Sequence, residues 1–242
     1  MHPVLLLPGT LCTGAIFEHQ IKALEPLASR VEVVQFRRER SIEEMAATVA
    51  QRIPTGTSAA IAGFSMGGMV ALALARQAPE KIARLALLNS NHHGDRVERR
   101  ALRLNQLAAA TESDLPGLIE RDYLPRYLHR QAPGHRTLIL DMARELGMDC
   151  FRAQTAALAD RPDASVSLRA LDCPTLILGA TDDPLCPPPV QLEMHRLAAH
   201  SDLVMLGDCG HFSTLERPEA VSDAMRSWYL EKNLGSKNLG SE

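Results

Sequence analysis

The stretch AIAGFSMGGMVALALA, residues 60–75, joins an apolar segment typical of a β-strand to an alanine- and leucine-rich segment typical of a helix. Ser65 stands at the junction, with Gly63 two residues before it and Gly67 two residues after it. A serine in this position is either an ordinary helix N-cap or a nucleophile exposed on a tight turn. The flanking glycines favour the nucleophile, because a tight turn between strand and helix leaves no room for larger side chains.

The strand and helix around Ser65 are one unit of a pattern that repeats along the chain. Short apolar runs predict buried strands at residues 4–7, 31–36, 59–62, 85–88, 175–178 and 203–206. Amphipathic segments predict helices between most of them, at residues 17–28, 41–53, 66–77, 190–199 and 218–229. This alternation predicts an α/β fold with a doubly wound, mostly parallel sheet of about six strands and helices on both faces.

A long segment without strand-like runs interrupts this alternation. Four helices are expected in it, at residues 96–110, 114–128, 135–146 and 149–158, separated by breaks such as QAPG and ARELGMDC. We therefore expect residues 91–165 to form a helical lid over one end of the sheet. The lid is inserted in a core made of residues 1–90 and 166–231, and residues 232–242 are expected to form a flexible tail.

Composition indicates a globular protein and excludes several classes of partner. The 242 residues are 45% hydrophobic and carry a net charge of −3, which gives no basic footprint for nucleic acid or an anionic membrane. Five cysteines without a CxxC pair do not suggest a disulfide framework. The N-terminal apolar run is too short for a secretory signal or a membrane span. We expect a cytoplasmic monomer or homodimer whose partner is a small molecule.

A serine nucleophile needs a base and a group that orients the base. Among nine histidines, His211 alone lies in a glycine-containing turn directly after the last predicted strand. Asp182 and Asp183 follow the strand predicted at residues 175–178, and either can accept a hydrogen bond from the imidazole. The carboxyl ends of parallel strands meet at one edge of a sheet, so all of these side chains are expected to lie close together.

Acyl transfer also needs donors for the negative oxygen that develops in the transition state. The backbone N–H of Met66, directly after Ser65, is one candidate. The turn after the first predicted strand supplies the second, because Gly9 lets the chain turn back toward Ser65. We expect the N–H of Thr10 to act there, with Leu11 as the alternative.

The sequence predicts no cofactor and no metal ion. Gly67 and Gly68 lack the lysine and the glycine spacing of nucleotide-binding loops. His92 and His93 are adjacent, so their side chains are expected to point apart, and no third ligand follows at zinc spacing. They are expected either to touch substrate or to be solvated.

Four segments, LLLPGTLCTG, GFSMGG, PTLILGATDDPLCPP and GDCGHFSTLERPEAV, occur in this order. With them the chain resembles the α/β-hydrolase superfamily, and in particular its small, lidded, esterase-like members. The resemblance covers nearly the whole chain and is weakest in the lid. It implies a serine hydrolase with Ser65 as nucleophile, His211 as base and Asp182 or Asp183 as the acid.

Within the resemblance, two spacings disagree about the acid. The distance to Pro187 selects Asp183, whereas the distance from the strand-ending Gly179 selects Asp182, and we prefer Asp183. The chain departs from many relatives in carrying Pro8-Gly9 where they have His-Gly. It also lacks the two additional N-terminal strands of larger members, so no antiparallel edge hairpin is expected.

These features predict hydrolysis of a small carboxylic ester, thioester or lactone through an acyl-enzyme. The same residues also suit carbon–carbon bond cleavage or an elimination of the synthase type. A third alternative is a ligand-binding module without catalysis, which would have no need for a base and its orienting group. The lid residues Tyr123, Arg126, Tyr127 and His129 either recognise a polar part of the substrate or form an ordinary half-exposed helix face.

Overall fold

Six parallel strands form the centre of the molecule. The computed structural model describes residues 1–109, 114–130 and 132–230, so the tail expected at 232–242 lies outside the described residues. The strands form one sheet in the order β2-β1-β3-β4-β5-β6, and each neighbouring pair is parallel. Their bounds are β1 (Val4–Leu7), β2 (Val31–Val33), β3 (Ala59–Phe64), β4 (Ile82–Leu88), β5 (Thr175–Ala180) and β6 (Ser201–Leu206). The predicted parallel sheet is confirmed, and the described strands include no antiparallel hairpin.

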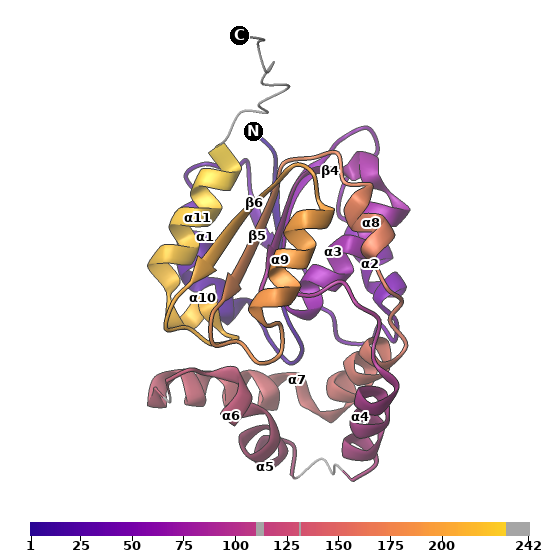
Figure 1. Ribbon diagram of the computed structural model, residues 1–242, viewed down its shortest axis with the longest axis vertical. Coiled ribbons are helices and arrows are strands. Elements are labelled where there is room, and N and C mark those ends of the chain that lie inside the picture. The colour runs from indigo at the N-terminus through magenta and orange to yellow at the C-terminus, as the bar shows by residue number, and fades with distance from the viewer. Residues whose placement is uncertain (110–113, 131, 231–242) are drawn as a thin grey trace.

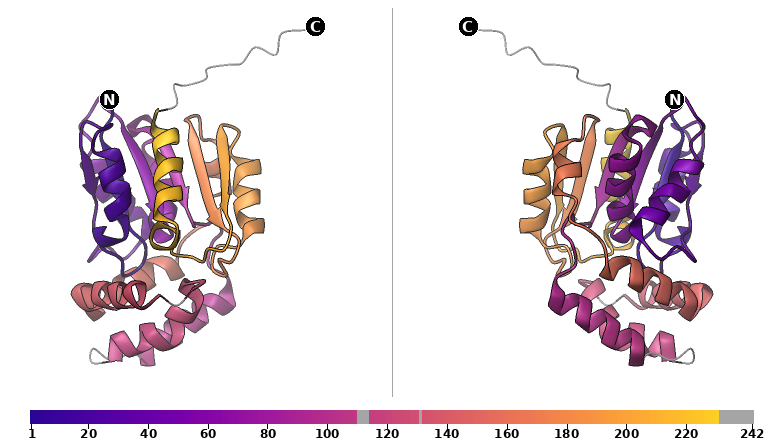
Figure 2. Two further views of the ribbon diagram at one scale, coloured as in Figure 1. Left: turned by 90° about the vertical axis from the view of Figure 1, so that its left-hand side faces the viewer. Right: turned by 90° about the vertical axis from the view of Figure 1, so that its right-hand side faces the viewer.

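Helices cover both faces of this sheet, as Figure 2 shows edge-on. Alternate residues of each strand point to opposite faces. Val4 and Leu6 therefore pack in the apolar core under α1 and α11, whereas Leu5 and Leu7 pack under the helices of the other face. The core helices are α1 (Glu18–Leu24), α2 (Ile42–Gln51), α3 (Met66–Gln77), α8 (Ser165–Arg169), α9 (Pro188–Leu197), α10 (Ser213–Glu216) and α11 (Pro218–Leu230).

The second strand is shorter than the apolar run at residues 31–36 predicts. Beyond Val34 the chain leaves the sheet, and the carbonyl of Phe36 accepts hydrogen bonds from Gln154 Nε2 at 2.8 Å and Cys150 Sγ at 3.4 Å. Both donors belong to α7 (Pro133–Ala159), which lies in the inserted segment. Hydrogen bonds from α7 thus take the place of strand pairing at the end of the run at residues 31–36.

The inserted segment between β4 and α8 is helical and lies across the carboxyl ends of the strands, away from both termini (Figure 1). Its helices fall within the expected limits 91–165. The helix expected at residues 114–128 is divided, because Pro125 lacks an N–H and its ring disturbs the preceding turn. The helices of this helical insertion are α4 (Val97–Ala109), α5 (Leu115–Leu118), the π-helical turn η4 (Ile119–Tyr123), α6 (Leu124–Tyr127) and α7 (Pro133–Ala159).

The two helices expected at residues 135–146 and 149–158 form one long element with a break. Gly147 has φ 73° and ψ 179°, which interrupts the helical backbone of α7 at the predicted place. Among the helices that the structure describes, none is both long enough and apolar enough to cross a membrane.

Candidate active site

Ser65 occupies a sharp turn between β3 and α3. Its backbone has φ 52° and ψ −114°, a conformation that non-glycine residues seldom adopt. A Cβ atom on Gly63 would lie 2.3 Å from the carbonyl oxygen of Gly67, and one on Gly67 would lie 2.0 Å from the carbonyl oxygen of Leu7. Both glycines are therefore required by the close approach of backbone to backbone, as the sequence predicted.

Hydrogen bonds from the neighbouring strand hold this turn in place. The N–H of Ser65 donates to the carbonyl of Leu88 at 2.9 Å, and the hydroxyl of Ser90 donates to the carbonyl of Ser65 at 2.7 Å. A Cβ on Gly68 would lie 2.4 Å from the Ser90 oxygen. The strained residue is thus fixed on both sides of its Cα, which leaves the Ser65 side chain free to point away from the sheet.

His211 reaches Ser65 from the loop after β6. Its Nε2 lies 2.9 Å from Ser65 Oγ, and its Nδ1 lies 2.8 Å from Oδ2 of Asp183. His211 is 2% exposed, and its ring packs against Phe64 and Phe212 at centroid distances of 5.2 and 5.9 Å. The structure therefore brings the serine, the histidine and one of the two candidate aspartates into a single hydrogen-bonded chain.

Asp183 is buried and accepts four hydrogen bonds. Besides His211, the Asn89 amide donates to Oδ2 at 3.0 Å, and the N–H groups of Leu185 and Cys186 donate to Oδ1 at 2.8 and 3.0 Å. Burial alone raises the pKa of this carboxyl, but His211 and the other donors together outweigh it and hold the pKa below its usual value. The side chain is therefore a carboxylate at neutral pH.

Asp182 lies outside this chain. Its side chain is 43% exposed, accepts a hydrogen bond from the Thr181 hydroxyl at 2.7 Å, and lies 3.7 Å from Nδ1 of His129. Of the two aspartates that the sequence left open, the structure therefore places Asp183 beside His211.

Asn89 and Ser213 belong to the site although the sequence analysis did not single them out. Asn89 has φ 44°, and its amide oxygen accepts a hydrogen bond from the Ser213 hydroxyl at 2.5 Å while its amide nitrogen donates to Asp183. An asparagine directly after an apolar strand is the signal that was available, because asparagine tolerates positive φ better than most residues. Its partners could not be read from the sequence, since they follow other strands.

The helical insertion also supports the histidine. The backbone carbonyl of Tyr127, at the end of α6, accepts hydrogen bonds from the N–H groups of His211 at 2.8 Å and Phe212 at 3.2 Å. The Tyr127 ring stacks on the His211 ring at a centroid distance of 5.9 Å and an interplanar angle of 27°. The insertion therefore contacts the reactive end of the sheet through both backbone and side chain.

The turn after β1 lies against the elbow that carries Ser65. A Cβ on Gly9 would lie 3.2 Å from Ser65 Cβ, and the Thr10 hydroxyl lies 3.8 Å from the Met66 sulfur. Leu11 has φ 52°, and its N–H already donates to Oε1 of Gln154 at 2.8 Å. Met66 is the first residue of α3, where N–H groups have no partner within the helix. The N–H of Leu11 is therefore already used by Gln154, whereas Thr10 lies beside Met66.

Ser65 and His211 open into a cavity of about 930 Å³, including its mouth, between the sheet and the helical insertion. Apolar side chains surround the reacting end, among them Phe64, Phe151 and Phe212. Several charged side chains of the insertion line the rest of the cavity: Arg99, Arg103, Asp122 and Arg126. Burial, and then repulsion from the guanidinium groups of Arg103 and Arg126, lower the pKa of Arg99.

Two buried cysteines, Cys12 and Cys186, lie beside the site. Asp183, Cys186 and His211 have potential ligand atoms within 4.8 Å of one another, but Asp183 and His211 are already bonded to each other. Burial raises the pKa of the Cys186 thiol well above its usual value, and it does the same for Cys12. Both thiols therefore stay protonated, and all five cysteines are free.

Comparison with known proteins supports the same assignment of family. A model of the alpha/beta hydrolase family matches residues 4–224. A pimeloyl-[acyl-carrier protein] methyl ester esterase of Neisseria meningitidis is 30% identical over 199 residues, which cover 80% of this chain and 77% of that protein. An (E)-2-((N-methylformamido)methylene)succinate hydrolase of Acinetobacter baylyi is 25% identical over 171 residues, covering 69% of this chain and 64% of that protein.

Solved structures share the whole architecture. A thermophilic esterase from Thermogutta terrifontis superposes with a TM-score of 0.84 at 28% identity, covering 94% of this chain and 89% of that one. An enol-lactonase from Burkholderia xenovorans has the same fold, with a TM-score of 0.83 at 21% identity over 95% of this chain and 92% of that one. The chain therefore belongs to the alpha/beta hydrolase family and is a hydrolase of the esterase class.

Proposed function

We propose that the protein hydrolyses a small carboxylic ester through an acyl-enzyme on Ser65. The observation that carries this proposal is the hydrogen-bonded chain from Ser65 Oγ through His211 to Asp183, which begins on a strained turn and faces a cavity. A serine hydroxyl is a weak nucleophile until an adjacent base removes its proton. His211 is within hydrogen-bonding distance to act as that base, and Asp183 holds the ring in the required orientation.

The reaction then proceeds in two halves. Ser65 Oγ attacks the ester carbonyl carbon while His211 Nε2 takes the hydroxyl proton, and Asp183 stabilises the imidazolium that forms. Collapse of the tetrahedral intermediate breaks the bond to the alcohol, which leaves with the proton from His211. A water molecule next attacks the acyl-enzyme, gives its proton to His211, and releases the carboxylic acid and free Ser65.

The backbone N–H groups of Thr10 and Met66 are the donors that we assign to the developing oxyanion. Leu11 is not assigned, since its N–H already donates to Gln154. Each well-aligned donor of this kind contributes roughly 3 to 4 kcal/mol to the transition state. The strained turn at Ser65 supports the assignment, because it places the N–H of the next residue at the start of a helix.

The cavity favours an acyl group with an anionic end. Arg99, Arg103 and Arg126 come from the helical insertion and line the same cavity as Ser65, opposed there by Asp122. Arg103 is paired with Asp95 at 3.0 Å, whereas Arg99 and Arg126 form no ion pair among the described residues. Of the relatives named above, one acts on a pimeloyl-[acyl-carrier protein] methyl ester and the other on a substituted succinate, and the succinate is the one that carries free carboxylates. We infer that the insertion serves as a lid whose arginines select substrates.

The test compares the wild type with Ser65→Ala and with Ser29→Ala, which alters an exposed serine outside the site. With a short p-nitrophenyl ester, we expect Ser65→Ala to lose activity by about 10³-fold or more, and Ser29→Ala to match the wild type. A fluorophosphonate probe should add one mass adduct on Ser65 in the wild type and in Ser29→Ala only. Folded wild-type protein that shows neither turnover nor adduct would contradict the proposal.

A further inference from the structure

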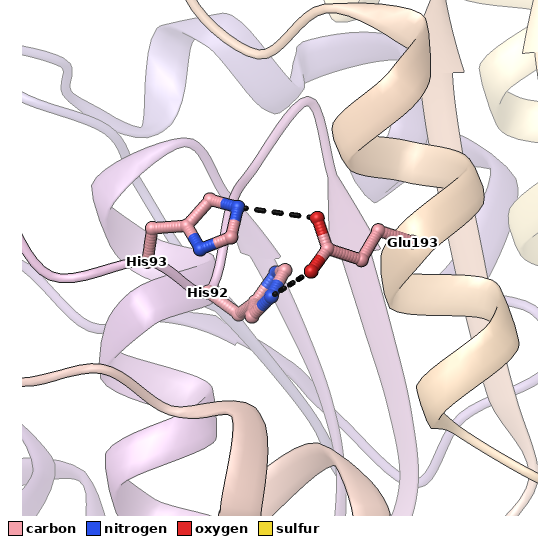
Figure 3. A group of neighbouring side chains, drawn as sticks. All are labelled: His92, His93 and Glu193. Atoms are coloured by element: carbon pink, nitrogen blue, oxygen red, sulfur yellow. Dashed lines mark ion pairs between the residues drawn. The ribbon is translucent and has the colours of Figure 1, made fainter.

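Two histidines and a glutamate meet at a second place in the fold, separate from the hydrogen-bonded chain at Ser65. His92 and His93 follow β4, and Glu193 lies on α9, with all three side chains directed at one another in Figure 3. Nε2 of His92 lies 3.5 Å from Oε1 of Glu193, and Nε2 of His93 lies 3.3 Å from Oε2. The potential ligand atoms of the three residues all lie within 4.8 Å of one another.

The sequence argument that adjacent histidines point apart is wrong here. It holds for a regular strand, but residues 90–96 adopt neither helix nor strand, and the two ring centroids lie 4.0 Å apart. The third ligand comes from a helix about 100 positions further along the chain, so no local spacing could indicate it.

His92 is buried without the hydrogen bonds that a buried imidazole normally makes. The residue is 2% exposed, and apart from the 3.5 Å ion pair of Nε2 with Glu193 neither ring nitrogen has a hydrogen-bond partner among the described residues. An imidazole nitrogen that lacks a hydrogen-bond partner has a lone pair available for a metal ion.

The separations fit tetrahedral zinc. Bonds of about 2.0 to 2.2 Å from zinc to imidazole nitrogen and carboxylate oxygen place neighbouring ligand atoms roughly 3.4 Å apart. The two His–Glu distances, 3.5 Å from His92 to Oε1 and 3.3 Å from His93 to Oε2, are close to that value, so each imidazole faces one oxygen of the same carboxylate. We propose that His92, His93 and Glu193 bind one divalent zinc ion, with water in the remaining position.

The surroundings complete the site. Nδ1 of His93 lies 3.6 Å from a carboxylate oxygen of Asp163, where it can orient the ring for coordination by Nε2. The side chains of His93 and Glu193 are 39% and 45% exposed, which gives an ion a path from solvent. Arg161, nearby in the same hollow, is paired with Asp95 at 3.1 Å, so its charge is compensated.

This zinc site would join the two connections between the helical insertion and the core. His92 and His93 lie where the chain enters the insertion, and Asp163 lies where it returns. The N–H of Ala164 already donates to the carbonyl of His92 at 2.7 Å, while Glu193 is fixed on core helix α9. A bound ion therefore links the base of the insertion to the core, and the insertion becomes more stable with the ion than without it.

The experiment uses full-length protein that has been stripped of metal with a chelator, and titrates it with zinc chloride in the presence of a phosphine reductant. Bound metal is measured by equilibrium dialysis. We expect one ion per chain in the wild type, and affinity weaker by at least about tenfold in His93→Gln and Glu193→Gln. His200→Gln is the matched control, because His200 is an exposed histidine 3.7 Å from a carboxylate of Asp172. It should bind zinc as the wild type does.

Thermal unfolding supplies a second measurement. A hundredfold excess of zinc over its dissociation constant should raise the Tm of the wild type by about 5 °C or more, and should raise that of the two ligand variants much less. Equal affinity in the wild type and both variants, or no saturable binding by the wild type, would overturn the proposal. So would zinc that is lost with His211→Gln and kept with His93→Gln, since it would then bind at Asp183, Cys186 and His211.

Discussion

Ser65 holds a backbone conformation that costs about 1 to 3 kcal/mol for a residue with a side chain. Its φ of 52° is maintained by the carbonyl of Leu88 and the hydroxyl of Ser90, which bond to its N–H and C=O. These bonds fix the backbone of the turn, so that the proposed attack by Ser65 needs no reorganisation there. At the scale of single residues, the site combines strain at the proposed nucleophile with four hydrogen bonds at Asp183.

Asp183 and Asp182 offer a matched pair for testing the role of the acid. In Asp183→Asn the side chain no longer accepts the imidazole N–H as a carboxylate does, so the histidine is held in the wrong tautomer. We expect kcat to fall by about 10³- to 10⁴-fold. Asp182→Asn alters an exposed neighbour of the same charge and should change kcat less than about twofold.

Steady-state kinetics on the two variants, with circular dichroism as a check on folding, makes this comparison. Equal small losses in both variants would contradict the role of Asp183, and a large loss confined to Asp182→Asn would assign the acid to the exposed residue.

At the scale of elements, α3 approaches the sheet more closely than a helix with ordinary side chains can. The absence of a Cβ on Gly67 lets the first turn of α3 contact the backbone of β1, and the absence of one on Gly63 lets β3 contact α3. The same close approach brings Met66 beside Thr10 of the turn after β1. The packing of helix on strand therefore also sets the position of the proposed oxyanion donors.

Gly67→Ala should destabilise the protein strongly. The new Cβ would lie 2.0 Å from the Leu7 carbonyl oxygen, which is backbone and cannot rotate away. We expect a loss of about 3 kcal/mol or more in the free energy of unfolding, measured by urea denaturation. Gly134→Ala is the control, because a Cβ there has no atom within 4 Å, and alanine at this helical position should be neutral or slightly stabilising. A loss below about 1 kcal/mol for Gly67→Ala would show that the elbow can relax.

At the scale of the whole molecule, the cavity has two chemically different walls. The sheet edge supplies Ser65 and His211, whereas the helical insertion supplies the arginines together with aromatic side chains such as Phe151 and lies across the ends of the strands (Figure 1). Under the proposed function, the reacting groups lie on the sheet edge and the arginines that select the substrate lie on the insertion. Removal of one of these arginines should therefore alter which ester is used without altering how it is cleaved.

Arg126→Gln tests this separation with two methyl esters of equal acyl length, monomethyl adipate and methyl hexanoate. Loss of one charged hydrogen bond should reduce kcat/KM for the adipate ester by about tenfold, and kcat/KM for the hexanoate ester by less than about twofold. Arg144→Gln, on the exposed face of α7 and paired with Asp141, is the control. Equal effects on both esters would exclude a role for Arg126 in recognising the distal carboxylate.

The sequence sufficed for those parts of the fold and site that depend on local patterns. The run at residues 60–75 predicts both β3 and α3, and a histidine after the last apolar strand predicts the position of His211. Between Asp182 and Asp183 the sequence supported only a preference for Asp183 from two conflicting spacings, because the two are adjacent and only the path of the following loop buries one of them. The contacts of Asn89 and Gln154 could not be predicted from the sequence for another reason, since their partners come from distant elements.

The two hydrogen bonds that the Tyr127 carbonyl accepts have a consequence for redesign. They run from the loop of His211 to the end of α6, so the part of the chain that we propose to select the ester also helps to hold the proposed base. Grafting the insertion of another hydrolase onto this sheet would remove that acceptor and leave two buried N–H groups unpaired. A chimera that keeps its turnover must therefore bring a backbone carbonyl to the same point. Only insertions with a helix that ends there are suitable for such a graft.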